Sequence, residues 1–575
     1  MEWHDWKPET FELARERGVP VFLFVGASWC RFCRELESRV LATPIVDALL
    51  TSRFVAIHVD KDRRPDLAAR YSRGGWPTLA YLDDQGEAIA SDGFLEPEAL
   101  LVRLELVSAY WSDQHDAVRR RLAEAADRVA EEPHARAELA HDLPETIAAA
   151  LLESADPVHG GWGTRHKFPH PDALEFALQR WSRTGDEALR KLVLRTLRNM
   201  QVGEIHDRVD GGFYRFATAP DWSGPHHEKV LDSNAQRLRA YVEASQALGE
   251  ASFRDTAEGC VRFLAGTLFD PALGAFRGSQ DADPVYAHLR TREARAAHGT
   301  PACDPTIFAN WNALAVSALL RAGVVLERPD CTELALRALD FVVEELVDGS
   351  EGIHHFWDGT FHLPGLLTDP AHVLGALVDA AQYSGRSRYL RVAESVASST
   401  VTTLAAERGG FWDTRHDPSL RGPLRRRERS LADNSRLAEA LLALSVLTRN
   451  PRWRDLARET LASFAGDYRR HGPAIAAYGR AVDLYLNPPV HVVIVGLPDA
   501  DDTRALQRAA LAPYVASRVV QVVAPQADRD LLERLELPWE GGVAHAYVSR
   551  ERESFAETVD PLRLPALMTR VEAGV

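Results

Sequence analysis

The sequence predicts an α/β domain at the N-terminus, a mainly α-helical (α/α)6 toroid in the middle and a small α/β segment at the C-terminus. Three observations predict this order. Short strands alternate with helical patterns at the start of the chain, long amphipathic helical segments then follow one another, and the alternation returns near the end. We therefore place the domains at 1–110, 111–487 and 488–575.

Length and composition indicate a globular protein of several domains. The 575 residues exceed what one hydrophobic core holds, and 46% hydrophobic and 26% charged residues are ordinary values. No window approaches the roughly eighteen unbroken apolar residues of a membrane span. The first residues lack the apolar core of a secretory signal. We expect a cytoplasmic protein with no membrane partner.

Charge and cysteine content point away from further classes. A formal net charge of −16 disfavours nucleic acid as a partner, because like charges repel. Five cysteines are too few for an extracellular disulfide scaffold. The run VVIVGLP after residue 491 has no GxGxxG pattern, so a dinucleotide site is not expected. We expect no cofactor and no metal.

Short runs rich in β-branched and aromatic residues predict the strands of the N-terminal domain. Helical patterns lie between these runs. The predicted strands cover 19–26, 53–60, 79–84 and 87–93, and the predicted helices cover 8–18, 33–42 and 66–73.

Cys30 and Cys33 form a CxxC motif directly after the first predicted strand. Cys30 would lie at a helix N-terminus, where unpaired N–H groups and the helix dipole favour the thiolate, and Arg31 adds positive charge. Cys30 would attack a disulfide and Cys33 would resolve the mixed disulfide, so a disulfide-bearing protein is the expected partner. A zinc half-site is the weaker interpretation, because no second CxxC or nearby CxxH supplies the remaining ligands.

The order strand, W-C-x-x-C, helix, strand, helix and then R-G-G-W-P-T-L resembles the thioredoxin fold over about residues 8–108. The resemblance implies that Pro77 stands in the place of that fold's cis-proline, facing the dithiol, and that Trp76 and Pro77 take part in substrate binding. One position departs from the fold, since Phe24 stands where thioredoxin keeps a buried acidic residue. An inert dithiol in a docking domain is therefore the competing interpretation.

Segments with a 3.6-residue period fill the middle of the chain. A turn of glycine followed by an aromatic residue recurs between helix pairs, near 159, 210, 273, 351 and 408. Each helix hairpin needs neighbours to bury its apolar face, and about twelve such helices close into a ring. An open solenoid is the alternative. In a ring, the recurring loops would gather at one end.

Two blocks, DPVHGGWGTRHKFPHPDALEF at 156–176 and GGFYRFATAPDWSGPHHEKVLDSNAQ at 211–236, resemble signature blocks of the spermatogenesis-associated protein 20 family. GAFRGSQDAD, NWNALAV, GGFWDT and VVIVG follow in the family's order. The resemblance implies a thioredoxin-like domain joined to a six-hairpin glycosidase-like toroid. The chain departs from the family at Arg31 and Arg34, where histidines are common, and at Ser549, near which the family often has a cysteine pair.

The loops of the toroid supply polar and aromatic groups together. Aromatic faces beside carboxylates suit a sugar ring, whose apolar face stacks while its hydroxyls form hydrogen bonds. A saccharide-like small molecule is therefore the expected ligand. The candidate catalytic residues are His206, Asp210, His227, Glu228 and Asp281, and the candidate binding residues are Lys167, Trp222, His226, Lys229, Asp232, Asp283, Trp311 and Asn312.

Two chemistries suit these residue types. Hydrolysis of a glycoside needs two carboxyl groups, for which Glu228 with Asp210 or Asp281 are the pairs. Epimerisation beside a carbonyl would use His206 and His227 as acid and base near neutral pH. A simpler interpretation is structural, because aspartates next to such turns often cap helices and pin loops.

Taken together, these observations predict a redox dithiol coupled to a toroid that binds or modifies a saccharide-like ligand. The alternative is an interaction protein without enzymatic activity, in which both folds are docking surfaces. A third hypothesis is a thiol–disulfide oxidoreductase whose toroid only holds the substrate.

Overall fold

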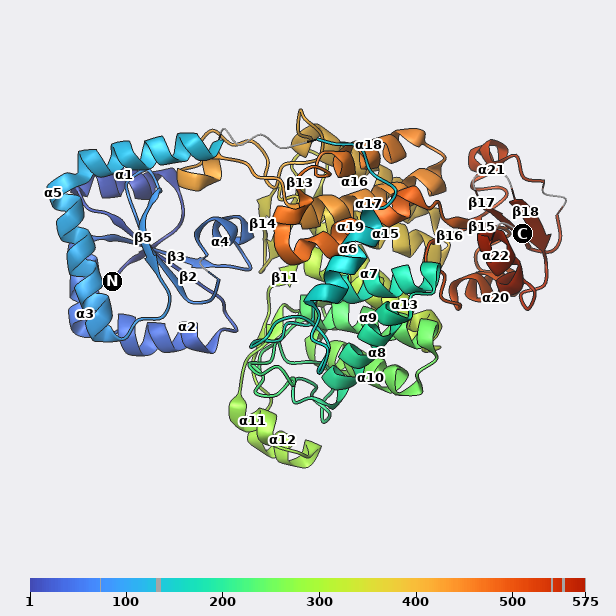
Figure 1. The fold of residues 1–575 in the computed structure, drawn as a ribbon, viewed down its shortest axis with the longest axis horizontal. Helices are drawn as coiled ribbons and strands as arrows, with labels where there is room; N and C mark the ends of the chain where they lie inside the picture. The colour runs from blue at the N-terminus through green and yellow to red at the C-terminus, as the bar shows by residue number, and fades with distance from the viewer. Residues whose placement is uncertain (73, 131–135, 539–540, 551–553, 574–575) are drawn as a thin grey trace. The chain divides into compact units, whose positions relative to one another are not determined.

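The chain folds into two compact units in a computed structural model, which we draw as a ribbon in Figure 1. One unit contains Met1–Pro133 and Asp413–Glu428, and the other contains His134–Trp412 and Arg429–Val575. The structure describes all residues of the chain except 73, 131–135, 539–540, 551–553 and 574–575.

A five-stranded sheet with the order β1-β3-β2-β4-β5 forms the centre of the first unit (Figure 1). β1, β3 and β2 run parallel to one another, β4 runs antiparallel to β2, and β5 runs antiparallel to β4. All residues of β2 and β4 are buried, as expected for strands covered on both faces. The strands are β1 (Trp3–His4), β2 (Val21–Gly26), β3 (Val55–Asp60), β4 (Thr78–Leu82) and β5 (Ala88–Asp92).

Helices surround this sheet, and the predicted thioredoxin-like α/β fold is confirmed. The helices are α1 (Pro8–Arg17), α2 (Arg31–Glu35) with a π-helical continuation (Leu36–Leu41), α3 (Pro44–Arg53), α4 (Pro65–Tyr71) and α5 (Pro97–Ala130), which is kinked at Gln114. β1 was not predicted from the sequence, because two residues are too few to show a period of any kind.

Residues 413–428 complete the hydrophobic core of the first unit, although they lie far from it in the sequence. Leu424 is 1% exposed and belongs to the same apolar cluster as Trp6. Arg426 donates two hydrogen bonds to the Glu87 carboxylate, at 2.7 and 3.1 Å. The core of this unit is therefore built from two distant stretches of the chain.

Six inner helices close into a ring within the described residues of the second unit: α7, α9, α13, α15, α17 and α19 pack each against the next, and α19 packs against α7. Each inner helix also pairs with one outer helix, in the set α8, α10, α14, α16, α18 and α6. The predicted (α/α)6 toroid is therefore confirmed, and the open solenoid is not the solution that the chain adopts.

The inner helices are α7 (Pro171–Thr184), α9 (Leu231–Leu248), α13 (Ala309–Val325), α15 (Thr368–Ser384), α17 (Leu431–Thr448) and α19 (Ile475–Leu486). The outer helices are α6 (Leu143–Ser154), α8 (Glu187–Val202), α10 (Ala251–Phe263), α14 (Pro329–Phe341), α16 (Ser387–Leu404) and α18 (Pro451–Ala462). In the described part of the chain, no helix combines the length and the apolarity needed to cross a bilayer.

Long loops precede the inner helices, at one end of the ring, and contain short elements. The strands in them are β6 (Lys229–Val230), β7 (Phe269–Asp270), β8 (Ala275–Phe276), β9 (Ser279–Gln280), β10 (Cys303–Asp304), β11 (Ile307–Phe308), β12 (Val347–Asp348), β13 (Gly352–Trp357) and β14 (Phe361–Pro364). Two short helices, α11 (Pro284–His288) and α12 (Arg292–His298), lie in the loop before α13.

The C-terminal segment forms a four-stranded sheet with the order β16-β15-β17-β18, and β16 packs against α15 and α17 of the ring. The Val520 N–H of β16 donates to the Gln382 side chain of α15 at 3.0 Å. Its elements are β15 (Val490–Val495), α20 (Asp501–Leu511), β16 (Arg518–Val523), α21 (Arg529–Leu535), β17 (His545–Arg550), β18 (Ser554–Thr558) and α22 (Leu564–Ala573).

Leu424→Ala is expected to destabilise the first unit by about 2–5 kcal/mol, because it removes buried apolar contacts and leaves a cavity. Native-state hydrogen exchange of the β2 and β4 amides measures this loss. Leu106→Ala is the matched control on α5, because Leu106 is 59% exposed, and it should change stability by less than about 0.5 kcal/mol. Equal losses in both variants would show that residues 413–428 add nothing to this core.

Candidate functional site

The two cysteines of the CxxC motif lie at the start of α2. Cys30 is the N-cap residue, and its Sγ accepts a hydrogen bond from the Cys33 backbone N–H at 3.3 Å. The two Sγ atoms are 2.6 Å apart, with Cys33 donating to Cys30, and both cysteines are buried and in the thiol form. The hydrogen bond to Cys30, together with burial, raises the pKa of Cys33. Cys33 therefore keeps its proton at neutral pH.

Aromatic and polar groups surround the dithiol. Pro77 follows Trp76 through a cis peptide bond, and the Trp76 carbonyl oxygen lies 4.0 Å from Cys30 Sγ. The Trp29 indole N–H donates to the Asp62 carboxylate at 2.7 Å, which fixes the ring next to the motif. The structure thus brings four residues singled out in the sequence, both cysteines, Trp76 and Pro77, to one place.

Acidic groups lie near the dithiol, although Phe24 occupies the place of the usual acid and stacks on His58 with ring centres 4.6 Å apart. Glu37 lies one helical turn after Cys33, pairs with His58 at 3.4 Å, and has a pKa raised by burial. At the end of β3, burial raises the pKa of the Asp60 carboxyl to about 6. Both groups can exchange protons nearer to neutral pH than an ordinary carboxyl.

Lys167 and Lys229 hold two loops of the toroid in the same way. The Lys167 ammonium donates to the Asp156 carboxylate at 2.7 Å and to the Gly160 carbonyl at 2.8 Å. Lys229 donates to the Asp207 carboxylate and, at 2.9 Å, to the equivalent glycine carbonyl. Both lysines are fully buried, so these contacts account for them without a ligand.

Asparagines at the fourth residue of three inner helices pin the Gly-aromatic turns. Asn234 in α9, Asn312 in α13 and Asn434 in α17 each accept the N–H of the turn's aromatic residue and donate to its carbonyl, at 2.7–3.1 Å. The aromatic residues are Phe213, Phe276 and Phe411. Asn312, which the sequence analysis placed in the binding site, is fully buried in this structural role.

Asp210 belongs to an ionic network between the loops. Arg295 lies 2.7 Å from Asp207 and 2.5 Å from Asp210, and the Tyr286 hydroxyl donates to Asp210 at 2.7 Å. Burial acts in the opposite direction, yet Lys229 and Arg295 together lower the pKa of Asp207 to about 2. Carboxylates paired in this way hold α11 and α12 to the loop before α9.

The predicted histidines pack against aromatic rings. His206 stacks on Phe213 with ring centres 4.7 Å apart, and His227 lies edge-on to a tyrosine at 5.0 Å. Burial lowers the pKa of both histidines, so both are neutral at pH 7. His226 lies 3.7 Å from the buried Glu228. Within the described residues, no three His, Cys, Asp or Glu side chains are placed to hold a metal ion.

The remaining predicted residues are spread over several loops and helix starts. Trp222 is fully buried, and its indole N–H donates to a backbone carbonyl at 3.1 Å. Asp283 caps α11 with an N–H contact of 2.9 Å. Asp232 and Trp311 lie in the first turns of α9 and α13, and Asp281 follows β9. Many of the predicted loop residues thus have contacts that hold the loops themselves.

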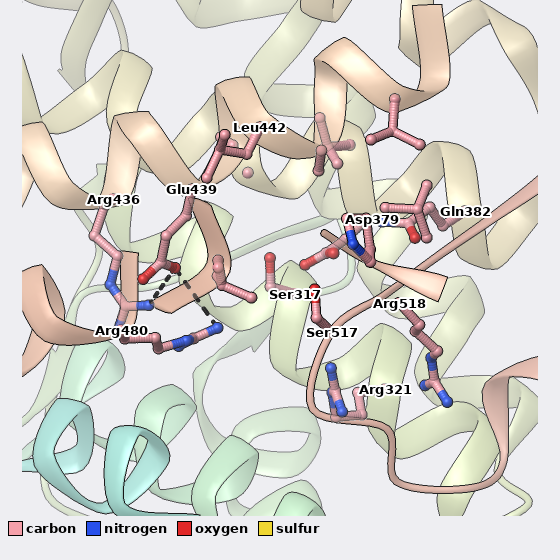
Figure 2. A pocket seen from close by; sticks show the side chains of 18 of the residues that line it. Ser317, Arg321, Asp379, Gln382, Arg436, Glu439, Leu442, Arg480, Ser517 and Arg518 are labelled. Carbon is pink, nitrogen blue, oxygen red and sulfur yellow. Dashed lines mark hydrogen bonds and ion pairs between the residues drawn. The ribbon is translucent and has the colours of Figure 1, made fainter. Parts of the chain in front are cut away.

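A cavity of about 200 Å³ lies inside the ring of inner helices, and we call it the axial cavity (Figure 2). Residues of α9, α13, α15, α17 and α19 line it, together with 515–519 of the C-terminal segment. Its polar lining includes Arg239, Ser317, Arg321, His372, Asp379, Gln382, Arg436, Glu439, Arg454, Arg480, Ser517 and Arg518.

On one side of the axial cavity, two arginines are balanced by carboxylates (left in Figure 2). Glu439 lies 3.2 Å from Arg436 and 3.6 Å from Arg480. From α7, Asp172 pairs with Arg436 and Glu175 pairs with Arg480. Three carboxylates therefore meet two guanidinium groups on this side of the cavity.

On the opposite side of the axial cavity lie two further arginines, Arg321 and Arg518 (right in Figure 2). Glu243 lies 3.4 Å from Arg321 and 3.1 Å from Arg239, so it is shared. Arg518 donates to the Ala510 carbonyl at 3.0 Å. Burial, with Arg321 near by, lowers the pKa of Arg518. Positive charge therefore prevails on this side.

Serine and aspartate side chains lie between the two pairs of arginines, and a histidine also lines the cavity. Ser317, Ser517 and Asp379 occupy the middle of the view in Figure 2. Burial raises the pKa of Asp379. Burial, with Arg436 near by, lowers the pKa of His372 to about 4, so this imidazole is neutral at pH 7. The middle of the cavity can therefore donate hydrogen bonds to a ligand and accept them from it.

The axial cavity was not predicted from the sequence, because the predicted ligand groups all lie in loops and at helix starts. Asp379 and Arg480 interrupt long apolar runs of α15 and α19, two helices with apolar residues around most of their circumference. Isolated charges in such helices are the signal that could have found the cavity, because a buried charge needs a buried partner.

Sequence comparisons support the two-part architecture. A family model described as a protein of unknown function, DUF255 (Thioredox_DsbH), matches residues 1–130. The chain is 24% identical to spermatogenesis-associated protein 20 of Homo sapiens over 708 aligned positions, which cover 99% of this chain and 90% of that protein. It is also 24% identical to the disulfide bond reductase DsbH of Chlamydia pneumoniae over 106 residues, which cover 16% of this chain and 63% of that protein. The expected resemblance to the spermatogenesis-associated protein 20 family is confirmed.

Among solved structures, the cellobiose 2-epimerase of Spirochaeta thermophila is similar to this chain. The TM-score is 0.50 at 17% identity, and the match covers 64% of this chain and 99% of that chain. At this level of identity, the similarity shows a shared toroid fold.

His372→Gln is expected to make the protein less sensitive to acid. The pKa of His372 is about 4 in the folded chain and about 6.5 in the unfolded chain, so between these values the unfolded state binds more protons. The free energy of unfolding then falls as the pH drops from 7 towards 4, by about 1.4 kcal/mol per unit and about 3 kcal/mol in all.

Denaturant unfolding of both proteins at pH 7, 6 and 5 measures this difference. The variant should lose less stability than the parent over this range. His141→Gln, at an exposed position of the same unit, is the control and should follow the parent. Identical pH profiles for His372→Gln and the parent would contradict the expectation.

Proposed function

We propose that this chain, a relative of spermatogenesis-associated protein 20 over nearly its whole length, performs thiol–disulfide exchange at Cys30 and Cys33 and binds a saccharide-like ligand in its toroid. The observation that carries the redox half is the pair of sulfurs 2.6 Å apart at the start of α2. The axial cavity supports the saccharide half.

The exchange starts with the Cys30 thiolate, which attacks one sulfur of a disulfide in a partner protein. A Cys30–partner disulfide forms, the partner's own S–S bond breaks, and its other sulfur leaves as a thiolate that takes up a proton. Cys33 then gives up its proton, attacks Cys30 Sγ and releases the second partner thiol. Two electrons pass to the partner, and an external dithiol must reduce the resulting Cys30–Cys33 disulfide.

The assignment of Cys30 as the nucleophile follows from its hydrogen bonds. Its sulfur accepts both the backbone N–H and the thiol of Cys33, and each bond stabilises a negative charge on Cys30. Glu37, whose pKa is raised by burial, acts electrostatically on Cys33 and is the acceptor that we propose for the Cys33 proton. This arrangement would replace the buried acid that Phe24 displaces.

Exposed apolar groups next to the motif suit a protein partner. Phe32, inside the motif, is 44% exposed and lies edge-on to Phe94 at 6.4 Å. Trp76 is half-buried, and Gly74 and Gly75 beside it are exposed. An extended chain carrying a disulfide could therefore lie against this surface and reach Cys30.

The axial cavity suits a small polar ligand. Its volume of about 200 Å³ is below the roughly 300–1,000 Å³ of sites for drug-sized molecules, so a single sugar ring is the appropriate size. Ser317, Ser517, Asp379 and His372 offer hydrogen bonds to hydroxyl groups. A protein with the same toroid fold is named a cellobiose 2-epimerase, which acts on a saccharide.

Cys30→Ser is expected to abolish reduction of a disulfide-linked peptide by the pre-reduced full-length protein, because the attacking sulfur is missing. Cys33→Ser should instead accumulate a Cys30–peptide disulfide, because nothing resolves it. Mass spectrometry of the acid-quenched reaction distinguishes the two results. Cys303→Ser, which changes a half-buried cysteine of the toroid, is the control and should react like the parent.

Undiminished peptide reduction by Cys30→Ser would refute the redox half of the proposal. It would favour the alternative in which this fold is a docking module with an inert dithiol.

Saccharides that bind the axial cavity should raise the melting temperature of the full-length protein by a few degrees, because they bind only the folded state. Asp379→Asn should reduce this shift, since the variant loses a carboxyl group in the middle of the cavity. Asp499→Asn, at a side chain that is 92% exposed, is the control and should keep the full shift. An equal shift in all three proteins would place the saccharide elsewhere.

A further inference from the structure

We infer that the ligand of the axial cavity is an anionic sugar, with a carboxylate or phosphate that binds beside Arg321 and Arg518. This inference rests on the proposed saccharide binding and names the chemical class of that ligand. It is carried by the distribution of charge around the cavity.

Guanidinium groups outnumber carboxyl groups around the axial cavity. Six arginines line it, namely Arg239, Arg321, Arg436, Arg454, Arg480 and Arg518. Two carboxyl groups, Asp379 and Glu439, line it as well. Behind the lining, Asp172, Glu175 and Glu243 pair with these arginines. Among the described residues the positive groups therefore exceed the negative ones by one, and by two when Asp379 is protonated.

The excess positive charge lies on the side of Arg321 and Arg518. Glu243 is the carboxylate paired with Arg321, and Arg239 shares it. Among the described residues, the Arg518 guanidinium donates to the backbone carbonyls of Ala510 and Pro513 and lies near the Tyr383 hydroxyl, and the carboxylate that acts on it, Glu243, is the one already paired with Arg321 and Arg239. One carboxylate shared among three arginines leaves buried positive charge only partly balanced, which is costly, so an anion that binds here gains a favourable interaction.

The opposite side of the cavity does not attract an anion. There Glu439 already lies between Arg436 and Arg480, and two carboxylates of α7 pair with the same arginines. Ser317 and Ser517 lie between the two sides in Figure 2. A sugar ring could therefore meet the serine hydroxyls while its acidic group reaches the guanidinium groups, which bind carboxylate and phosphate through paired N–H donors.

Isothermal titration of the full-length protein at constant ionic strength tests the inference with four probes: glucose, glucuronate, glucose 6-phosphate and inorganic phosphate. Glucuronate or glucose 6-phosphate should bind at least tenfold more tightly than glucose. The two sugars distinguish a carboxylate from a phosphate as the preferred group. Inorganic phosphate should compete with the tighter sugar, because it occupies the same arginines.

Arg518→Gln should abolish the preference for the charged sugar over glucose. Arg518→Lys should keep part of it, because a point charge remains without the paired donors. Arg504→Gln, at an exposed arginine of α20, is the matched control and should keep the full preference. Circular dichroism and the melting temperature without ligand show whether each variant is folded, and Arg518→Lys carries the test if the glutamine variant is not.

Two outcomes would overturn the inference, and they differ in what they leave standing. Equal binding of glucose and the charged sugars, unchanged in Arg518→Gln, would refute the anionic ligand but leave the saccharide site intact. No binding of any sugar would refute the saccharide half of the proposed function as well.

Discussion

The closed ring of inner helices is the constraint on which the second unit depends, because it encloses charged side chains that must find partners inside. Glu175 of α7 shows how the ring uses this need. It pairs with Arg480 of α19 and lies 3.5 Å from Arg239 of α9, the two neighbours of α7 in the ring. This buried carboxylate lies between two guanidinium groups, and its contact with Arg480 joins the first inner helix to the last. Apolar packing is less specific, because one apolar helix face can pack against many others. These charged side chains therefore link α7 to both of its neighbours in the ring, and several of them also line the axial cavity.

The loops that precede the inner helices are held by a second set of contacts, which recurs at several of the Gly-aromatic turns. In the first two turns an aspartate and a glycine carbonyl accept from one lysine. In later turns an arginine makes one of these two contacts: Arg277 pairs with Asp270 at 2.8 Å, and Arg429 donates to the Gly409 carbonyl at 2.7 Å. Lysine is rare in this arginine-rich chain, and a compact ammonium group suits a site with one carboxylate and one carbonyl. The persistence of lysine at two turns thus has a packing explanation.

The fold could be predicted from the sequence because it depends on local periods and on motifs that are contiguous in the chain. The same holds for the dithiol, since Cys30 and Cys33 lie on one helix turn and Pro77 begins a recognisable strand. The toroid site could not be predicted in this way. Residues such as Asn312 and Lys229 have the chemistry of a binding site, but they use it to satisfy backbone groups of their own turns. The axial cavity gathers residues from five inner helices, and no short stretch of sequence contains that pattern.

The insertion at 413–428 offers a physical reason why both folds occur in one chain. Its two ends are held together, because the Asp413 N–H donates to the Glu428 carbonyl at 2.7 Å and the Glu428 N–H donates to the Asp413 carboxylate at 2.8 Å. It leaves the toroid directly after the turn that Asn434 pins, and Leu424 within it is buried in the core of the thioredoxin-like unit. The N-terminal fold thus takes part of its core from the toroid's sequence. Folding alone therefore favours a single chain, and the covalent link between the two folds does not require that a reaction product pass from the dithiol to the axial cavity.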